Sequence, residues 1–204
     1  GLLFGAFQAG YLVGVVPLGM FADRHSSRVV IAAGAAVAAT ASIAFGALAD
    51  GFLSGALLRF VAGVGMAGVY VPGMRFVSEW FDAATRGRAM GVYVGTFSLG
   101  SGLSFVLTPV VATEFGWRAG LLVTSALALL AAPTMYLFGR DATRTTHRRR
   151  GFDLSVLRNG SFLAGVGVYG AHNWELYGVR NWLPAFLVST VAVGSTATPA
   201  ATAG

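Results

Sequence analysis

The sequence predicts an all-α membrane protein, a polytopic bundle of transmembrane helices. Long stretches without any charged side chain alternate with short charged segments. Because an α-helix rises about 1.5 Å per residue, about 20 apolar residues cross a hydrocarbon core of about 30 Å. Hydrophobic residues make up 55% of the chain and charged residues 11%, and the mean hydropathy is +0.70. These values exclude an ordinary water-soluble domain.

Six stretches with few or no charges are the expected membrane helices. The third contains Arg59, and the sixth contains Glu175 and Arg180. The connection at residues 49–51 is so short that it predicts a hairpin between antiparallel helices. The expected spans are residues 1–20, 29–49, 52–74, 89–111, 119–138 and about 161–188.

The arginines predict which loops face the cytoplasm. All 14 basic residues are Arg, and eleven of them lie in three alternate loops, residues 21–28, 75–88 and 139–160. Only Arg118 lies in the opposite set of loops. Basic loops stay on the cytoplasmic side, so this placement explains the net charge of +6 without a nucleic-acid partner. The expected external connections are residues 49–51, 112–118 and the stretch after about 188.

Nothing in the sequence indicates an enzyme. There is no Cys and no phosphate-binding loop, and His25, His147 and His172 lack metal-ligand spacing. An intramembrane enzyme would need a pair of catalytic side chains inside a predicted span, and only His172 and Glu175 could form one. No nucleophile with a base lies beside them. We therefore expect no catalytic residue, no cofactor and no metal.

Four motifs follow one another along the chain. They are Gly19-x-x-x-Asp23-Arg24 with Arg28, the run Arg59-x-x-x-Gly63-x-Gly65-x-x-Gly68-x-x-x-Pro72, Glu79-Trp80-Phe81 followed by Arg86-Gly87-Arg88, and Trp117-Arg118. In their order and loop placement they resemble the major facilitator superfamily, and the resemblance covers nearly the whole chain.

The resemblance implies a secondary transporter that works by alternating access. The six spans are similar to helices two to seven of the family, so we expect the first and the last five helices to belong to a longer chain. On this alignment, residues 1–138 belong to the N-terminal bundle, 139–160 form the central cytoplasmic loop, and 161–204 hold the next helix and an external loop. The expected partners are a small-molecule substrate, membrane lipid, a coupling proton and the remaining helices. The expected location is the cell membrane.

The resemblance implies a gating role for residues 19–28, here named the 19–28 motif. In the family this loop locks the two bundles in one conformation. The residues expected to act are Gly19, Asp23, Arg24 and Arg28. An acid at a helix end can pair with Arg or accept bonds from a helix N-terminus, and a Gly one turn earlier suits close helix approach.

The 19–28 motif departs from the family pattern at two positions. The family has a Gly and then a basic residue where this chain has Ser26 and Ser27. Arg28 is the candidate to make the ionic contact in their place. The alternative is that the charges of the motif only fix the orientation of the chain in the membrane.

Arg59 is the first candidate for substrate binding or proton coupling. It lies about 10 Å from the outer surface by helical rise, where an unpaired Arg is costly unless it faces a cavity or a partner. Gly55 and Gly63 flank it at four-residue spacing and give the helix one small face. The alternative is a structural Arg that binds backbone carbonyls.

The sixth span supplies the other candidates. His172 and Glu175 are three residues apart and share a helix face. A buried Glu near an Arg can load and release protons near neutral pH. Tyr177 is a further candidate for substrate binding, and a structural contact of Glu175 is the alternative. Trp174, Tyr177 and the Trp-Leu-Pro ending resemble uptake families for small anions, such as cyanate- and nitrate-type permeases.

The expected function is proton-coupled transport of a small organic or inorganic anion. Gly87, Gly91 and Gly95 predict a packing face, but no Gly-Pro pair follows, and drug–proton antiporters of the family carry one in this helix. The alternatives are a multidrug efflux antiporter and a non-transporting membrane sensor or degenerate paralogue. Arg148–Arg150 predict contact with anionic lipid headgroups or serve only the orientation of the chain.

Overall fold

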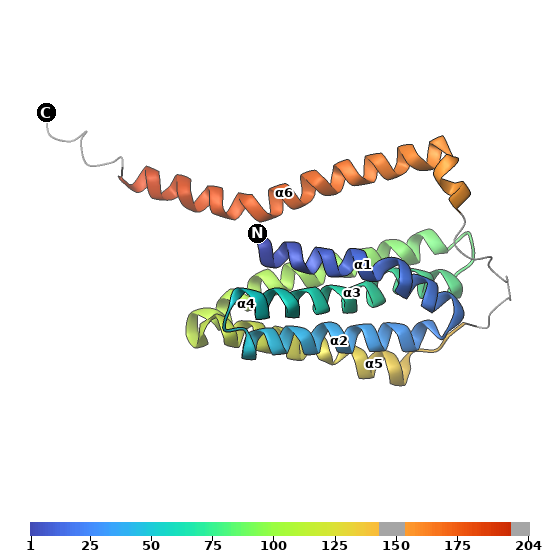
Figure 1. The fold of residues 1–204 in the computed structure, drawn as a ribbon, viewed down its shortest axis with the longest axis horizontal. Coiled ribbons are helices and arrows are strands. Elements are labelled where there is room, and N and C mark those ends of the chain that lie inside the picture. Colours follow the sequence, from blue (N-terminus) through green and yellow to red (C-terminus); the bar gives the residue numbers. More distant parts are fainter. Residues whose placement is uncertain (143–153, 197–204) are drawn as a thin grey trace, which may run out of the picture. The chain divides into compact units, whose positions relative to one another are not determined.

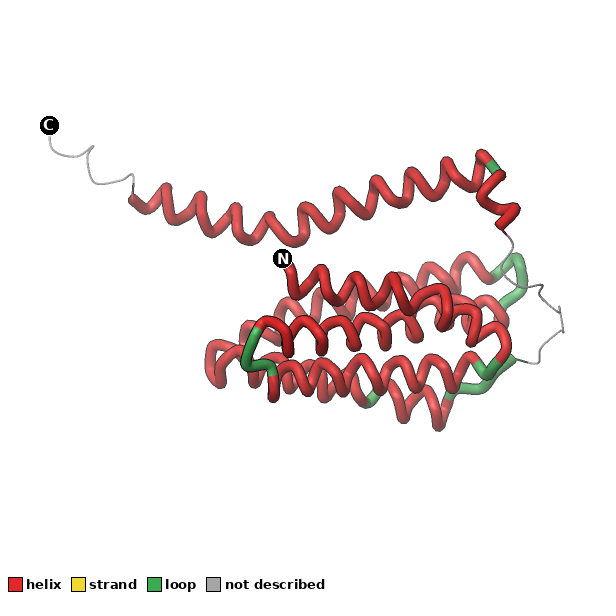
Figure 2. Tube along the Cα trace, in the orientation of Figure 1, coloured by secondary structure: helices red, strands yellow, loops and turns green. Residues whose placement is uncertain are grey.

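The computed structural model describes residues 1–142 and 154–196, and every regular element in these ranges is a helix (Figures 1 and 2). The chain divides into two compact units, Gly1–His147 and Arg148–Gly204, and the division falls inside the predicted central loop. The first unit contains α1 to α5, and the second contains η1 and α6. The helices are α1 (Leu2–Arg24), α2 (Ser27–Leu48), α3 (Phe52–Trp80), α4 (Arg86–Leu129), α5 (Ala131–Phe138), the short 3-10 helix η1 (Leu154–Arg158) and α6 (Gly160–Thr196).

Among the described residues, four helical stretches are long and apolar enough to cross a membrane. They are α1, α2, α3 and the combined stretch of α4 and α5, Arg86–Phe138, which has 53 residues. That stretch is about 80 Å of helix, enough to cross a core of about 30 Å twice. The four stretches therefore accommodate the first five predicted spans.

The predicted sixth span lies within α6, which has 37 residues. This helix is not among the four apolar stretches found in the described part of the chain. Glu175 and Arg180 lie near its middle and interrupt its apolar sequence. The crossing of the membrane by α6 remains a prediction.

A reversal at Gly116 divides α4 into two arms. Gly116 has φ 83° and ψ 161°, a conformation that residues with a Cβ rarely adopt. A Cβ at Gly120 would lie 2.8 Å from the carbonyl oxygen of Thr108, so the arms contact each other closely. The predicted external loop at 112–118 is thus wrong in length, because one glycine makes the turn and helix continues on both sides.

Two predicted cytoplasmic loops are also shorter in the structure. The loop expected at 21–28 is reduced to His25 and Ser26, and the loop expected at 75–88 to residues 81–85. A charged residue marks the edge of the apolar core, whereas a helix continues into the polar region as long as its backbone is hydrogen-bonded. Arg75 and Glu79 therefore lie on α3 itself. The hairpin predicted at 49–51 is confirmed.

Small residues bring the helices of the first unit together. A Cβ at Gly10 or Gly63 would overlap a backbone carbonyl oxygen across the α1–α3 contact, and a Cβ at Gly34 would lie 2.7 Å from the carbonyl oxygen of Gly65 across the α2–α3 contact. The small face predicted beside Arg59 is thereby confirmed at Gly63. Large apolar side chains instead face outward, which suits packing in lipid. Examples are Leu12, Leu53, Phe105 and Phe115.

The glycine face predicted on α4 has no such contact. Within the described residues, no atom lies within 4 Å of a Cβ placed at Gly87, Gly91 or Gly95. Close packing of this face remains a prediction.

Candidate functional site

The acid of the 19–28 motif is paired within the first unit. Asp23, in the last turn of α1, accepts a hydrogen bond from Arg75 Nη1, and Arg75 Nε donates to Glu79 Oε1 at 2.7 Å. The side chains of Asp23, Arg75 and Glu79 are partly exposed, at 38%, 24% and 25%. Of the two partners expected for this acid, a helix N-terminus or an Arg, the structure shows the Arg, and the gating role remains a prediction. Sequence reasoning missed Arg75, although its four-residue spacing from Glu79 is a signal of a helical ion pair.

The other members of the motif have different surroundings. Arg28 donates from Nη1 to the carbonyl oxygen of Gly139 at 3.5 Å, and its guanidinium lies 5.3 Å from the centre of the Tyr136 ring. Arg24 is exposed at the C-terminal end of α1, where a positive charge is favourable. A Cβ at Gly19 would meet only Val71, at 3.9 Å, so the close approach expected at Gly19 does not occur within the described first unit.

Arg59 lies about two turns into α3, and its depth in the membrane remains a prediction. Its guanidinium carbon is 4.2 Å from the centre of the Phe45 ring of α2. Two of its nitrogens, Nε and Nη2, are buried and have no hydrogen-bond partner in the described structure. These two atoms therefore do not bind backbone carbonyls, as the alternative of a structural Arg would require. Phe45 was missed because it lies on another helix.

An aromatic cluster lies on α3 and α4. Tyr70 follows Arg59 by three helical turns and so shares its face of α3. The Tyr70 ring lies 6.2 Å from the Tyr93 ring and 5.9 Å from the Phe97 ring, between ring centres. The Tyr93 hydroxyl donates to the carbonyl oxygen of Tyr70 at 3.1 Å. Sequence reasoning gave no sign of this cluster, because aromatic residues are common on every face of a membrane helix.

The Tyr93 hydroxyl contacts α3 in the turn that precedes Pro72. Pro72 lies inside α3 and has no N–H to donate to the preceding turn. The Tyr93 hydroxyl also lies 3.4 Å from the carbonyl oxygen of Val69. A Cβ at Gly73 would overlap this hydroxyl, so glycine is needed there to admit the side chain.

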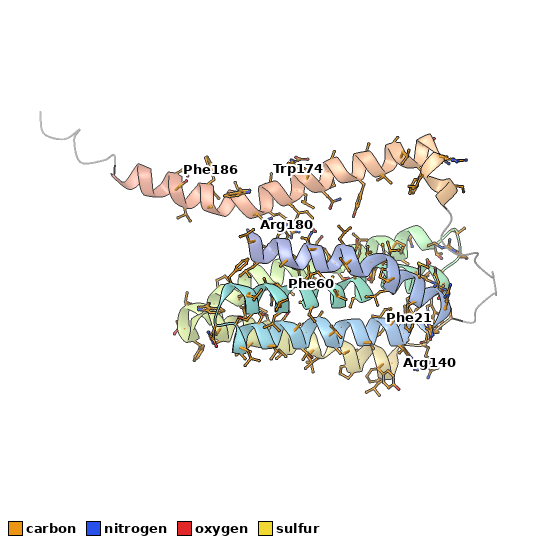
Figure 3. All side chains as sticks on the ribbon, viewed as in Figure 1. Phe21, Phe60, Arg140, Trp174, Arg180 and Phe186 are labelled. Atoms are coloured by element: carbon orange, nitrogen blue, oxygen red, sulfur yellow. The ribbon has the colours of Figure 1, made fainter. Side chains whose placement is uncertain are left out.

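The candidates on α6 are close in the sequence to Trp174, which Figure 3 labels on that helix. His172 and Glu175 are exposed, and no hydrogen bond or ion pair joins them in the described part of α6. Tyr177 is half-buried within its unit, and its carbonyl oxygen accepts a bond from Asn181 at 2.7 Å. Arg59 belongs to the first unit and Glu175 to the second, so their pairing remains a prediction. Arg148–Arg150 lie outside the described residues.

At the opposite end of the first unit from Asp23, Arg118 joins two connections that were predicted to be external. Its guanidinium donates to the carbonyl oxygens of Ala47 and Ala49 at 3.3 Å each and to Asp50 Oδ1 at 3.0 Å. The guanidinium also lies 5.2 Å from the centre of the Trp117 ring. The hairpin at 49–51 and the turn at Gly116 therefore meet at one end, as the alternating topology requires.

Known transporters from bacteria and plants are similar to this chain in sequence. The chain is 24% identical over 200 residues to a hexuronate transporter of Bacillus subtilis, which covers 92% of the chain and 47% of the relative. It is 26% identical over 189 residues to a probable sulfoacetate transporter of Cupriavidus necator, with 92% and 43% covered. It is also 35% identical over 118 residues to a probable chloroplastic anion transporter of Arabidopsis thaliana, with 57% and 22% covered. The chain thus spans about half the length of the first of these relatives.

A solved structure shows the same fold. It is that of a bacterial homologue of the human lysosomal transporter spinster, in an inward-facing and occupied conformation. The TM-score is 0.57 at 21% identity, and the match covers 74% of this chain and 38% of the other. The family described as the Major Facilitator Superfamily matches residues 1–203. The chain therefore belongs to the Major Facilitator Superfamily, as a multi-pass membrane protein of a family of transporters and not of enzymes.

Proposed function

We propose that the full-length protein is a secondary active transporter of the cell membrane that moves a small organic or inorganic anion by alternating access. In this proposal Arg59 binds the anionic group, and Glu175 with His172 carries a coupling proton. Tyr177 borders the same pathway.

The state of Arg59 is the observation that carries the proposal. A guanidinium is always charged, and two of its nitrogens are buried here without a hydrogen-bond partner in the described structure. Leaving buried charged donors unpaired is costly, and the face of Phe45 offsets only part of that cost. A carboxylate, sulfonate or phosphate would accept hydrogen bonds from the planar fork of donors.

The relatives support an anion of this kind. Two of them are named for hexuronate and sulfoacetate, and a third, 24% identical over 141 residues, is named as a probable L-galactonate transporter of Escherichia coli. Each of those compounds carries at least one acidic group. An anionic substrate fits an Arg within the span better than a neutral or cationic one does.

The coupling residue is proposed on α6. Glu175 is the single acid of the predicted sixth span, and His172 lies one turn before it. A carboxylate inside a membrane helix is costly unless it faces water or a partner, and it is a common element of proton relays. We propose that its proton enters with the anion, which would allow inward movement against the substrate gradient.

The experiment uses the full-length protein in proteoliposomes. Uptake of radiolabelled glucuronate, sulfoacetate and L-galactonate is measured with and without an inward proton gradient. Arg59→Lys should reduce uptake of the transported anion about tenfold or more, because lysine keeps the charge but loses the two-donor fork. Glu175→Gln should abolish the response to the proton gradient and spare exchange of internal for external substrate.

Arg158→Lys is the matched control, since Arg158 is an exposed residue of η1 and the same substitution there should leave uptake unchanged. Uptake at the control rate by Arg59→Lys would refute the role of Arg59. Normal gradient-driven uptake by Glu175→Gln would refute the role of Glu175.

A further inference from the structure

Three consecutive residues after α5 are held by the cytoplasmic ends of α2 and α3. Asp141 accepts a hydrogen bond from the Ser26 hydroxyl and another from the backbone N–H of Arg28, at 3.0 Å. The carbonyl oxygen of Arg140 accepts a bond from Trp80 Nε1 at 3.0 Å, and that of Gly139 accepts the bond from Arg28 described above. Figure 3 shows Arg140 at the same end of the first unit as Phe21 of α1. The chain is thus fixed by contacts beyond the last turn of α5.

The chemistry of the α2 N-terminus explains the contact with Asp141. The first N–H groups of a helix have no partner within the helix. Ser26 is the N-cap and accepts a bond from the N–H of Val29 at 3.3 Å, while Asp141 takes the N–H of Arg28. A carboxylate is also favoured there by the helix dipole. Asp141 therefore completes the cap from a segment more than a hundred residues away in the chain.

Ser26 stands where the family pattern has a Gly. A glycine has no side-chain donor, so the hydrogen bond from Ser26 to Asp141 exists only because this chain departs from the pattern. The 19–28 motif is consequently held on two sides, through Asp23 by Arg75 and through Ser26 and Arg28 by Asp141.

We propose that Asp141 is a positioning residue for the 19–28 motif. It fixes the start of α2, and with it the two-residue connection that sets Asp23 against Arg75. The effect of Asp141 on transport rests on the proposed function, whereas its effect on the start of α2 does not. Asp141 lies outside the motif, and one of its two hydrogen bonds to the motif requires the hydroxyl of Ser26.

The first test is hydrogen–deuterium exchange of the full-length protein in nanodiscs. Asp141→Ala should raise the exchange rate of the Arg28 region, residues 25–31, about tenfold or more, which is the size expected for a hydrogen bond to a charged group. Asp141→Asn keeps an acceptor oxygen and should give a smaller increase. Ser26→Ala added to Asp141→Ala should raise the exchange rate by less than the two single effects combined, because both changes break the Ser26–Asp141 bond, although Ser26 also caps the N–H of Val29.

The control is Glu114→Ala, which removes an exposed acid near the turn at Gly116 and should leave residues 25–31 unchanged. Unchanged exchange of residues 25–31 in Asp141→Ala would overturn the proposal. Full additivity of Ser26→Ala and Asp141→Ala would overturn the shared contact.

The second test separates positioning from a purely structural role. In the uptake assay, Asp141→Ala should lower the maximal rate severalfold and change KM by less than twofold, since Asp141 does not touch the substrate. A normal maximal rate despite faster deuterium exchange would overturn the role in transport. If the unsubstituted protein moved none of the probe anions, the proposed function would fail, while the exchange experiment would still decide whether Asp141 holds the motif.

Discussion

The close contact between α1 and α3 makes Gly63 a sharp test of the fold. In Gly63→Ala, the added Cβ would overlap the carbonyl oxygen of Phe7 and would lie 2.9 Å from the backbone nitrogen of Tyr11. Both are backbone atoms of α1, so no side chain can rotate away. Since ordinary contacts lie at about 3.5–4.0 Å, α1 must shift from α3 by about 1–1.5 Å to relieve the overlap with the Phe7 carbonyl oxygen.

The free energy of unfolding should fall as a result. Overpacking costs about 1–3 kcal/mol, and alanine regains up to about 1 kcal/mol in helix propensity. We expect a net loss of about 1–2 kcal/mol. The measurement is unfolding of the full-length protein by SDS in mixed micelles, followed by circular dichroism.

Gly5→Ala on α1 is the matched control. No atom lies within 4 Å of a Cβ at Gly5 in the described structure, so this variant should keep or slightly gain stability. If Gly63→Ala and Gly5→Ala unfolded at the same SDS fraction, the close α1–α3 approach would be wrong.

Three further predictions concern Asp23, the aromatic cluster and the start of α4. Asp23→Asn should impair uptake and leave membrane insertion intact, because it weakens the pair with Arg75; equal uptake at all substrate concentrations would reduce the motif to a topology signal. Tyr93→Phe should lower the free energy of unfolding by about 0.5–1.5 kcal/mol through loss of its bonds to α3, and an unchanged SDS midpoint would contradict this. Hydrogen bonds from the Thr85 side chain and backbone hold the pKa of Asp82 below its ordinary value, so the first turn of α4 should lose stability as the pH falls below about 4. Deuterium exchange of residues 82–90, corrected for its intrinsic pH dependence, should show this loss in the native chain and not in Asp82→Asn.

Much of the fold follows from where charges interrupt apolar sequence. The hairpin at 49–51 and the small face at Gly63 were predictable, because a short charged turn and a four-residue glycine spacing each allow few arrangements. The C-terminal end of α3 was not, because charge marks the edge of the membrane and not the end of the helix. The connection at 112–118 was predicted, but its reduction to a turn at Gly116 was not, because nothing local distinguishes this glycine from others in the chain.

The candidate site was predictable only in part. Arg59 and Asp23 are charges in unusual places, and the sequence alone shows that each needs a partner. Their neighbours Phe45 and Arg75 lie on other helices, and membrane helices are apolar on every face, so no periodic pattern indicates which side faces which neighbour. The contact of Asp141 with Ser26 was not predictable either, because the two residues lie more than a hundred positions apart in the sequence.

The bonds of Arg118 have a mechanical consequence. Separating the C-terminal end of α2 from the turn of α4 at Gly116 would leave a guanidinium, two carbonyl groups and Asp50 without these contacts. At the other end, Arg75 ties α3 to α1. Because polar contacts join the helices at both ends, the first unit should move as a rigid body. A displacement imposed near Arg59 should therefore reach Asp23 almost undiminished.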